Sequence, residues 1–201
     1  MHKSSIAGLL LVILCACSST AVPTSTTLPG VMTPTRDKAR EEELVYDALL
    51  KELFSSDLYV FMNMTQTDIL GLADTETYLA VEKTLGDLTP GLMLDFKRRN
   101  ESSHSLKTSM ILEANYIVFS IEDMQEMFGE NQNGWDIFYD RYPDAPGIIS
   151  LSRVGFNQEM DQALVYLGIQ SHWLAGSGTY YLMVSRNGSW IIQQSFMTWI
   201  S

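Results

Sequence analysis

The feature that most constrains the fold is the short segment Arg186–Ser189, which has Asn187-Gly188 at its centre. It separates two runs that are rich in β-branched and aromatic residues, 179–185 and 190–200. Asn-Gly between such runs is the strongest short-range signal for a β-hairpin, because both residues tolerate the positive φ of a type I′ turn. The end of the chain is therefore expected to contain antiparallel strands.

Two further strand-like runs precede this hairpin. The strand-like runs are 148–156, 162–169, 179–185 and 190–200. Turns are expected at 157–161 and 171–178, between the first three runs. Alternating apolar residues predict one packed face for two of these strands: Ala163, Val165, Leu167 and Ile169 in one, Trp190, Ile192, Phe196 and Ile200 in the other. We expect a four-stranded antiparallel meander, with Gly176 and Gly178 giving positive φ to its longest turn.

Helical patterns come before the meander. Segment 37–54 repeats apolar residues at three-to-four spacing, and Asp37 is placed to cap its N-terminus. Shorter helical stretches are expected at 75–85, 90–100 and 122–128, and strands at 58–64 and 110–121. Helices followed by sheet predict an α+β fold, in which the helices cover one face of the sheet.

The first residues are typical of a secretion signal. His2 and Lys3 form a short basic start. The apolar run from Ile6 to Leu14 is shorter than the ~20 residues that a bilayer span needs, which favours a signal peptide.

The segment Leu14-Cys15-Ala16-Cys17 follows and resembles the lipobox of bacterial lipoproteins. The resemblance implies that the chain is cut before Cys17, that the Cys17 sulfur carries a diacyl group, and that its amino group takes a further fatty acid such as palmitate. Cys15 fits the modified position poorly, because bulky Leu14 would then lie at the cut.

Three parts of the chain are therefore expected. These are a signal peptide (1–16), the lipidated cysteine with a Ser/Thr/Pro-rich tether (17–36) and a single α+β domain (37–201). The tether contains too few apolar residues to order itself. We expect the protein in the cell envelope, anchored through its N-terminal lipid in the outer membrane or on the outer face of the cytoplasmic membrane, with its domain outside the cytoplasm.

Charge and motif content exclude several classes of protein. The 13 basic and 24 acidic residues give a net charge of −11, which argues against a nucleic-acid partner. Two cysteines are too few for a disulfide scaffold or a four-cysteine zinc site. The sequence has no P-loop, GxGxxG, HExxH or GxSxG motif. We therefore assign no cofactor, no metal ligand and no catalytic residue.

Two charged segments each allow two interpretations. The acidic run Glu41–Glu43 is expected to be a solvated helix start that suits the helix dipole, and the alternative is a cation site. The basic run Lys97–Arg99 is expected to complement the end of the helix 90–100, and the alternative is a contact with lipid headgroups or an anionic ligand.

The candidate binding residues are Trp135, Tyr139, His172 and Trp173. The aromatic rings of segment 135–142 can stack on a sugar or an apolar ligand; alternatively they form the buried stripe of a short helix that Pro143 ends. Trp173 lies in a hairpin loop, where burial is hard to arrange and binding residues tend to collect. His172 beside it, and His104 in another polar loop, are expected to be exposed.

The C-terminal half resembles a group of uncharacterised bacterial proteins, many of them predicted lipoproteins. The resemblance is carried by residues 152–157, 162–166, 174–178 with Tyr180-Tyr181, 187–190 and 199–201. That group has no assigned activity, so the resemblance implies the meander and no mechanism. The expected sheet is also similar to the cone-shaped sheets of NTF2-like and cystatin-like folds, and such a likeness concerns the fold alone.

These observations predict a lipid-anchored envelope protein that binds a small ligand or a partner protein and catalyses no reaction. One alternative is an envelope-directed hydrolase, in which His104 or His172 acts as a base beside a carboxylate. Another alternative is a structural or assembly role through the sheet edge or the acidic helices.

Overall fold

The hairpin expected at Asn187-Gly188 is confirmed in the computed structural model, where the two residues have φ of 53° and 83°. The structure describes residues 36–56, 58–65, 75–106, 115–129 and 133–201. All of them belong to one compact unit, Thr35–Ser201. The expected signal peptide, the lipobox and, except for Arg36, the tether lie outside the described residues.

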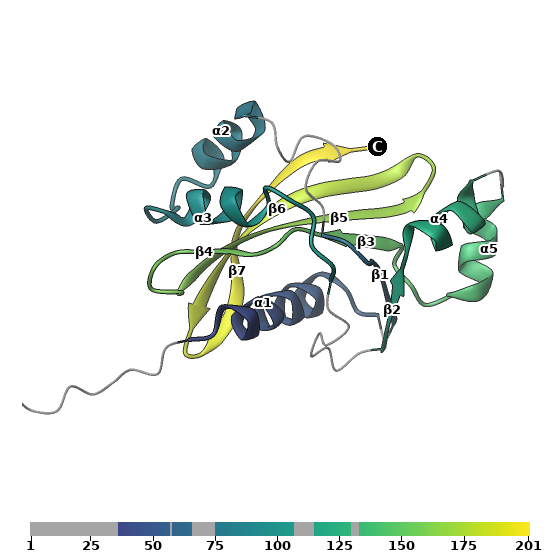
Figure 1. The fold of residues 1–201 in the computed structure, drawn as a ribbon, viewed down its shortest axis with the longest axis horizontal. Coiled ribbons are helices and arrows are strands. Elements are labelled where there is room, and N and C mark those ends of the chain that lie inside the picture. Colours follow the sequence, from purple (N-terminus) through teal and green to yellow (C-terminus); the bar gives the residue numbers. More distant parts are fainter. Residues whose placement is uncertain (1–35, 57, 66–74, 107–114, 130–132) are drawn as a thin grey trace, which may run out of the picture. The chain divides into compact units, whose positions relative to one another are not determined.

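The described ranges contain five helices and seven strands (Figure 1). The helices are α1 (Lys38–Leu53), α2 (Thr75–Thr84), α3 (Leu92–Arg99), α4 (Ile121–Phe128) and α5 (Gly134–Arg141). The strands are β1 (Leu58–Met62), β2 (Asn115–Phe119), β3 (Ile148–Leu151), β4 (Gly155–Phe156), β5 (Gln162–His172), β6 (Ala175–Arg186) and β7 (Ser189–Ile200). The predicted α+β fold is confirmed.

All strands form one mixed sheet in the order β2-β1-β3-β5-β6-β7, with β4 beside β5. Strands β3, β5, β6 and β7 pair antiparallel, which confirms the meander. Strand β1 pairs in parallel with both β2 and β3. Parallel neighbours require a crossover connection, and α2 and α3 lie in the connection between β1 and β2.

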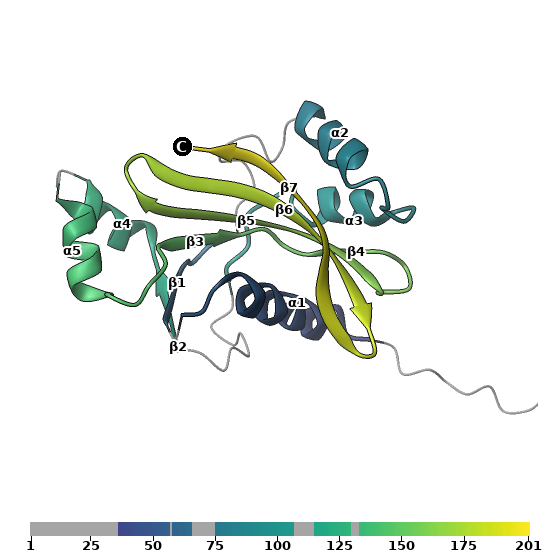
Figure 2. The same cartoon turned by 180° about the vertical axis from the view of Figure 1, so that it is seen from behind.

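Helices cover both faces of the sheet, so the expectation of one covered face is wrong (Figures 1 and 2). Helix α1 packs on one face, where Leu49 joins a cluster with Val165 of β5. Helices α2 and α3 pack on the opposite face of the meander, where the rings of Phe96 and Tyr180 lie 5.7 Å apart. Helices α4 and α5 cover β1 and β3, in a cluster that contains Val60. Both faces need a covering layer because β5 and β1 carry buried apolar side chains on both sides.

Strand β7 does not keep one packed face along its length, contrary to the expectation. Trp190 and Ile192 pack with α1, whereas Phe196 packs with α2 and α3. Ile192 and Gln194 pair with consecutive residues of β6, which leaves Gln193 as an extra residue. Such a β-bulge reverses the alternation of side chains, because the side-chain period of a strand is two.

The long turn expected at 171–178 is also wrong. Strands β5 and β6 continue to a connection made of Trp173 and Leu174 alone. Gly178 lies within β6, and a Cβ atom there would overlap Trp199 Nε1 and Tyr166 Oη. Trp199 Nε1 donates a hydrogen bond of 2.8 Å to that hydroxyl. The glycine is therefore required by packing and not by a turn.

A glycine at the contact between β4 and α3 provides a test of this packing. A Cβ atom on Gly155 would lie 2.6 Å from the Cα of Phe96. Overpacking costs about 1–3 kcal/mol, so we expect Gly155→Ala to lower the free energy of urea unfolding by that amount. Gly86 is the control, because no atom lies within 4 Å of its added Cβ. Equal losses in Gly155→Ala and Gly86→Ala would contradict the assigned contact.

Candidate functional site

The four candidate binding residues, which come from two distant segments, lie together at one end of the sheet. Helix α5 carries Trp135 and Tyr139, the end of β5 carries His172, and the β5–β6 connection carries Trp173 (Figure 1). The rings of His172 and Trp135 stack with their centroids 6.3 Å apart. Trp173 meets Trp135 edge-on at 6.5 Å. Tertiary structure thus joins residues that are far apart along the chain.

These aromatic residues differ sharply in exposure. Trp135 is only 4% exposed, so it belongs to the buried stripe of its helix. Trp173 is 46% exposed, and the neighbouring Leu174 is 82% exposed. Leu174 was not among the predicted binding residues, although an apolar residue in a hairpin turn is itself a signal of a binding surface. We call His172, Trp173 and Leu174 the hairpin-tip surface.

Hydrogen bonds hold this hairpin tip in one conformation. The Tyr139 hydroxyl donates to the Ser171 carbonyl at 3.0 Å, and the Ser171 hydroxyl donates to the Ala175 carbonyl at 3.1 Å. The side-chain amide of Gln170 donates to the backbone carbonyl of His172. Burial raises the pKa of Tyr139, so its hydroxyl stays protonated and remains a donor at neutral pH. The exposed side chains are therefore carried on an ordered backbone.

Among the described residues, neither histidine has the carboxylate partner that a general base needs. His104 is exposed, and its Nε2 lies 3.4 Å from the Ser102 hydroxyl. His172 is exposed and lies against Trp135. Within the described ranges, no carboxylate is hydrogen-bonded to either imidazole. The pairing that the hydrolase alternative requires is thus missing from this part of the chain.

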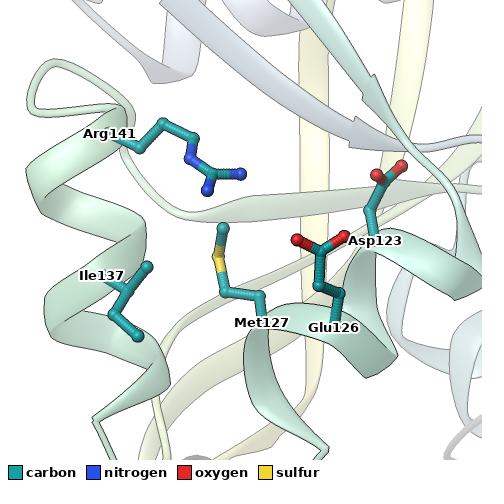
Figure 3. Close-up of a pocket in the computed structure, with 5 residues that line it drawn as sticks. All are labelled: Asp123, Glu126, Met127, Ile137 and Arg141. Atoms are coloured by element: carbon teal, nitrogen blue, oxygen red, sulfur yellow. The ribbon is translucent and has the colours of Figure 1, made fainter.

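A second feature lies between α4 and α5, a cleft of about 230 Å³ (Figure 3). It is lined by Asp123, Glu126 and Met127 of α4 and by Ile137 and Arg141 of α5. Asp123 is held in a capping box, in which it accepts a 2.8 Å hydrogen bond from the backbone N–H of Ser120. This bond and the Ser120 hydroxyl lower the pKa of Asp123. The cleft could not be predicted from the sequence, because its lining comes from two separate helices.

The acidic start of α1 is not solvated, so that expectation is wrong. Glu41 and Glu42 are each 8% exposed. Glu41 accepts a 2.9 Å hydrogen bond from the indole of Trp190 and pairs with Arg36. Protein donors therefore occupy the places that a bound cation would take.

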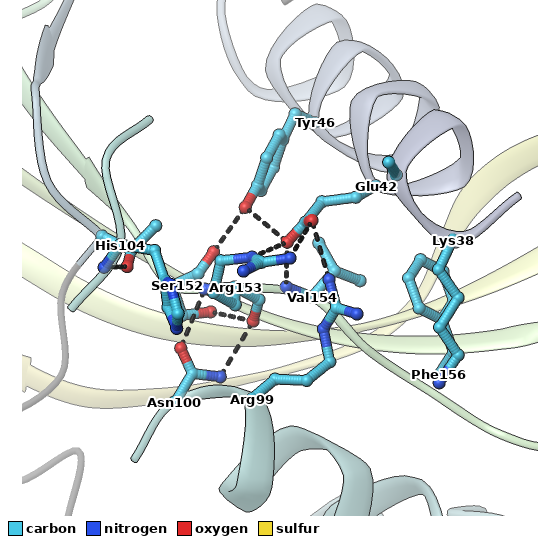
Figure 4. Close-up of polar contacts among 12 residues, drawn as sticks. Lys38, Glu42, Tyr46, Arg99, Asn100, His104, Ser152, Arg153, Val154 and Phe156 are labelled. Atoms are coloured by element: carbon cyan, nitrogen blue, oxygen red, sulfur yellow. Dashed lines mark hydrogen bonds and ion pairs between the residues drawn. The ribbon is translucent and has the colours of Figure 1, made fainter. Parts of the chain in front are cut away.

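Glu42 is the centre of a buried polar network (Figure 4). Its carboxylate accepts hydrogen bonds from Arg153 Nε at 2.8 Å, from Arg99 at 2.7 Å and from the backbone N–H of Val154 at 2.8 Å. Burial alone would raise the pKa of Glu42, but the Arg153 hydrogen bonds, the charge of Arg99 and the Val154 bond together lower it. The carboxylate is therefore ionised and fully paired at neutral pH.

The basic run at the end of α3 is divided among different partners. Arg99 binds Glu42, and Arg98 pairs with Asp95 at 2.6 Å. The Lys97 ammonium lies over the ring of Tyr78, 4.7 Å from its centroid. An intramolecular role thus accounts for each of these cations.

Comparison with protein-family models, with curated proteins and with solved structures finds no match for this chain. No helix within the described ranges has both the length and the apolar content to cross a membrane. In the same ranges, His, Cys, Asp and Glu side chains nowhere gather in threes as a metal site would require. The geometry of the chain itself is therefore the basis for the proposals below.

The Glu42 network makes stability depend on pH. Because the pKa of Glu42 is lower in the folded state, the unfolded chain binds more protons. The stability that the ionised Glu42 contributes is therefore complete above the ordinary glutamate pKa and is lost as pH falls from about 5. We expect Glu42→Gln to lower the free energy of unfolding by about 3 kcal/mol at pH 7, because two partly buried guanidinium groups, those of Arg99 and Arg153, lose their counter-charge. The free energy of unfolding of the variant should also fall less than that of the wild type between pH 7 and pH 3.

Urea unfolding at several pH values measures both effects. Glu43→Gln is the matched control, since Glu43 only forms a 3.4 Å pair with Arg40 on the surface of α1. If the Glu42 and Glu43 variants lost equal stability at pH 7, the network would not have the assigned role.

Proposed function

We propose that this chain is a lipid-anchored protein of the cell envelope, whose folded domain binds a partner protein through the hairpin-tip surface. The lipobox at Leu14–Cys17 supports the anchor. The exposed and ordered Trp173-Leu174 pair supports the binding role. Acyl chains on Cys17 would hold the domain at the membrane, since two or more chains give stable attachment.

The observation that carries the binding role is a half-exposed tryptophan on a preorganised loop. Trp173 packs edge-on against Phe128 at 5.7 Å and against Trp135, yet 46% of its surface remains accessible. Tryptophan is enriched among the residues that dominate protein interfaces. Because hydrogen bonds already order the loop, a partner would pay little conformational entropy on binding.

The shape of this surface favours a partner protein over a small ligand. Small-ligand sites are concave and enclose most of the ligand. The hairpin-tip surface is instead a projection of three exposed residues, with Leu174 82% exposed. A protein with a complementary groove can bury such a projection.

The hairpin-tip surface lies far from the residue at which the chain enters the domain. Arg36 lies over the ring of Trp190 at 5.5 Å, beside the β6–β7 turn. The hairpin-tip surface is at the other end of β6, whose twelve residues span roughly 40 Å. A domain tethered through residues 18–35 can therefore present this surface away from its point of attachment.

The anchor is tested by labelling cells with an alkyne fatty acid. We expect the wild-type chain to take up the label and to partition into detergent. Cys17→Ala should lose the label and enter the aqueous phase, because its acceptor sulfur is gone. Cys15→Ala is the control, since that residue leaves with the signal peptide. A Cys17→Ala chain that still carries the label would rule out this anchor.

The binding surface is tested with a photo-crosslinking residue placed at Leu174 in living cells. We expect a discrete crosslinked product, and we expect Trp173→Ala to reduce its yield about tenfold or more, because a buried interface tryptophan contributes about 2 kcal/mol. Leu79 of α2 is the control position, since it is 59% exposed but lies outside the hairpin-tip surface. Identical products from both positions would argue against a specific surface.

A further inference from the structure

Exposed carboxylates flank the hairpin-tip surface. Helix α5 meets the hairpin through Trp135 and through Tyr139, whose hydroxyl is bonded to the Ser171 carbonyl, and both views place α5 beside the end of β5 (Figures 1 and 2). Asp136 and Asp140 directly follow these two residues of α5 and are exposed. Because successive residues of a helix are about 100° apart, the two carboxylates lie along one flank of the face that contacts the hairpin.

These carboxylates differ from the buried acids of α1, which are paired with arginine. In the part of the chain that the structure describes, Asp136 and Asp140 form no ion pair. The pKa of Asp123 is lowered by its bonds to Ser120 and also by the charge of Arg141, so this guanidinium acts on α4. The surface beside the hairpin tip therefore has a negative field, which attracts cationic groups of a partner.

A buried donor beneath the tip has no acceptor. Trp135 is 4% exposed, and its indole N–H forms no hydrogen bond with any described residue. Such a group is costly, because it has given up its hydrogen bond to water. Two of the rings that lie against Trp135, those of His172 and Trp173, are exposed. A docked polypeptide that displaces the His172 ring can place a backbone carbonyl on this N–H, and a hydrocarbon tail cannot make that contact.

Charge also separates the occupants that an exposed Trp-Leu pair admits. Tryptophan is common at membrane interfaces, but an anionic lipid surface repels the flanking carboxylates within a Debye length of about 8–10 Å. A second copy of this chain is repelled as well, since its net charge is −11 and the cations at the end of α3 are bound within the chain. A cationic protein surface meets neither obstacle.

We propose that the hairpin-tip surface docks on a basic partner protein. The partner has an apolar groove that takes Trp173 and Leu174, and lysine or arginine side chains on the rim of this groove face Asp136 and Asp140. The inference rests on the partner binding proposed above and adds the chemistry of the partner. Rim charges steer the encounter and suppress wrong partners, so reversing their sign hinders docking.

The photo-crosslinking residue at Leu174 tests the charge of the partner. We expect Asp136→Lys with Asp140→Lys to lower the yield of the crosslinked protein about tenfold, because two attractions become repulsions. Changing both residues to glutamate keeps the charges and should keep the yield. Glu101→Lys with Glu159→Lys is the control of equal charge change, since both residues are exposed and Glu159 lies in the turn at the opposite end of β5. Thermal unfolding of each variant checks that it is folded.

The outcomes separate this inference from the proposed function. If the wild-type chain gives no discrete product, the binding surface itself is wrong and the basic partner falls with it. A discrete product with the same yield in the α5 double lysine variant and in its control would keep the binding surface and overturn the basic partner. A Leu174 crosslink to radiolabelled phospholipid, or a product that contains two copies of this chain, would also overturn it, because each identifies a different occupant.

Discussion

The ionic contact on which the rest of the structure depends is the one between Glu42 and the arginines that surround it. One carboxylate joins α1 to the end of α3 through Arg99 and to the β3–β4 junction through Arg153. The Tyr46 hydroxyl, one turn further along α1, donates to the Ser152 carbonyl at 2.7 Å. Helices α1 and α3 pack on opposite faces of the sheet. These contacts join the two helices at the break between β3 and β4, and so fix the helical layers on the two faces to each other.

Local sequence signals predicted the helices and strands well. Contacts between residues far apart in the chain caused the differences between the predicted and the observed elements. The Asn187-Gly188 turn and the alternation from Ala163 to Ile169 act between close neighbours, so they are readable from the chain. The expected strand 148–156 is instead divided into β3 and β4, because the backbone N–H of Val154 turns to Glu42. A carboxylate that lies over a hundred residues away is invisible to any local pattern.

The candidate site was predicted only in part, for the same reason. The exposure of Trp173 follows from its place in a tight hairpin, and that could be argued from sequence. Its position against α5 could not, since nothing local links the β5–β6 connection to Trp135. The α4–α5 cleft was missed altogether, because Asp123 and Arg141 become neighbours only when the two helices pack.

The acid excess of the chain divides into two populations with different consequences. Glu41, Glu42 and Asp95 are buried and neutralised by arginine and lysine, so they act as internal counter-charges. The described residues from 115 to 147 instead expose six carboxylates against one guanidinium: Glu122, Asp123, Glu126, Asp136, Asp140 and Asp144 against Arg141. Exposed acids repel an anionic membrane surface within about a Debye length of 8–10 Å. Under the proposed lipid anchoring, this repulsion would turn the end of the domain that carries the hairpin-tip surface away from the membrane.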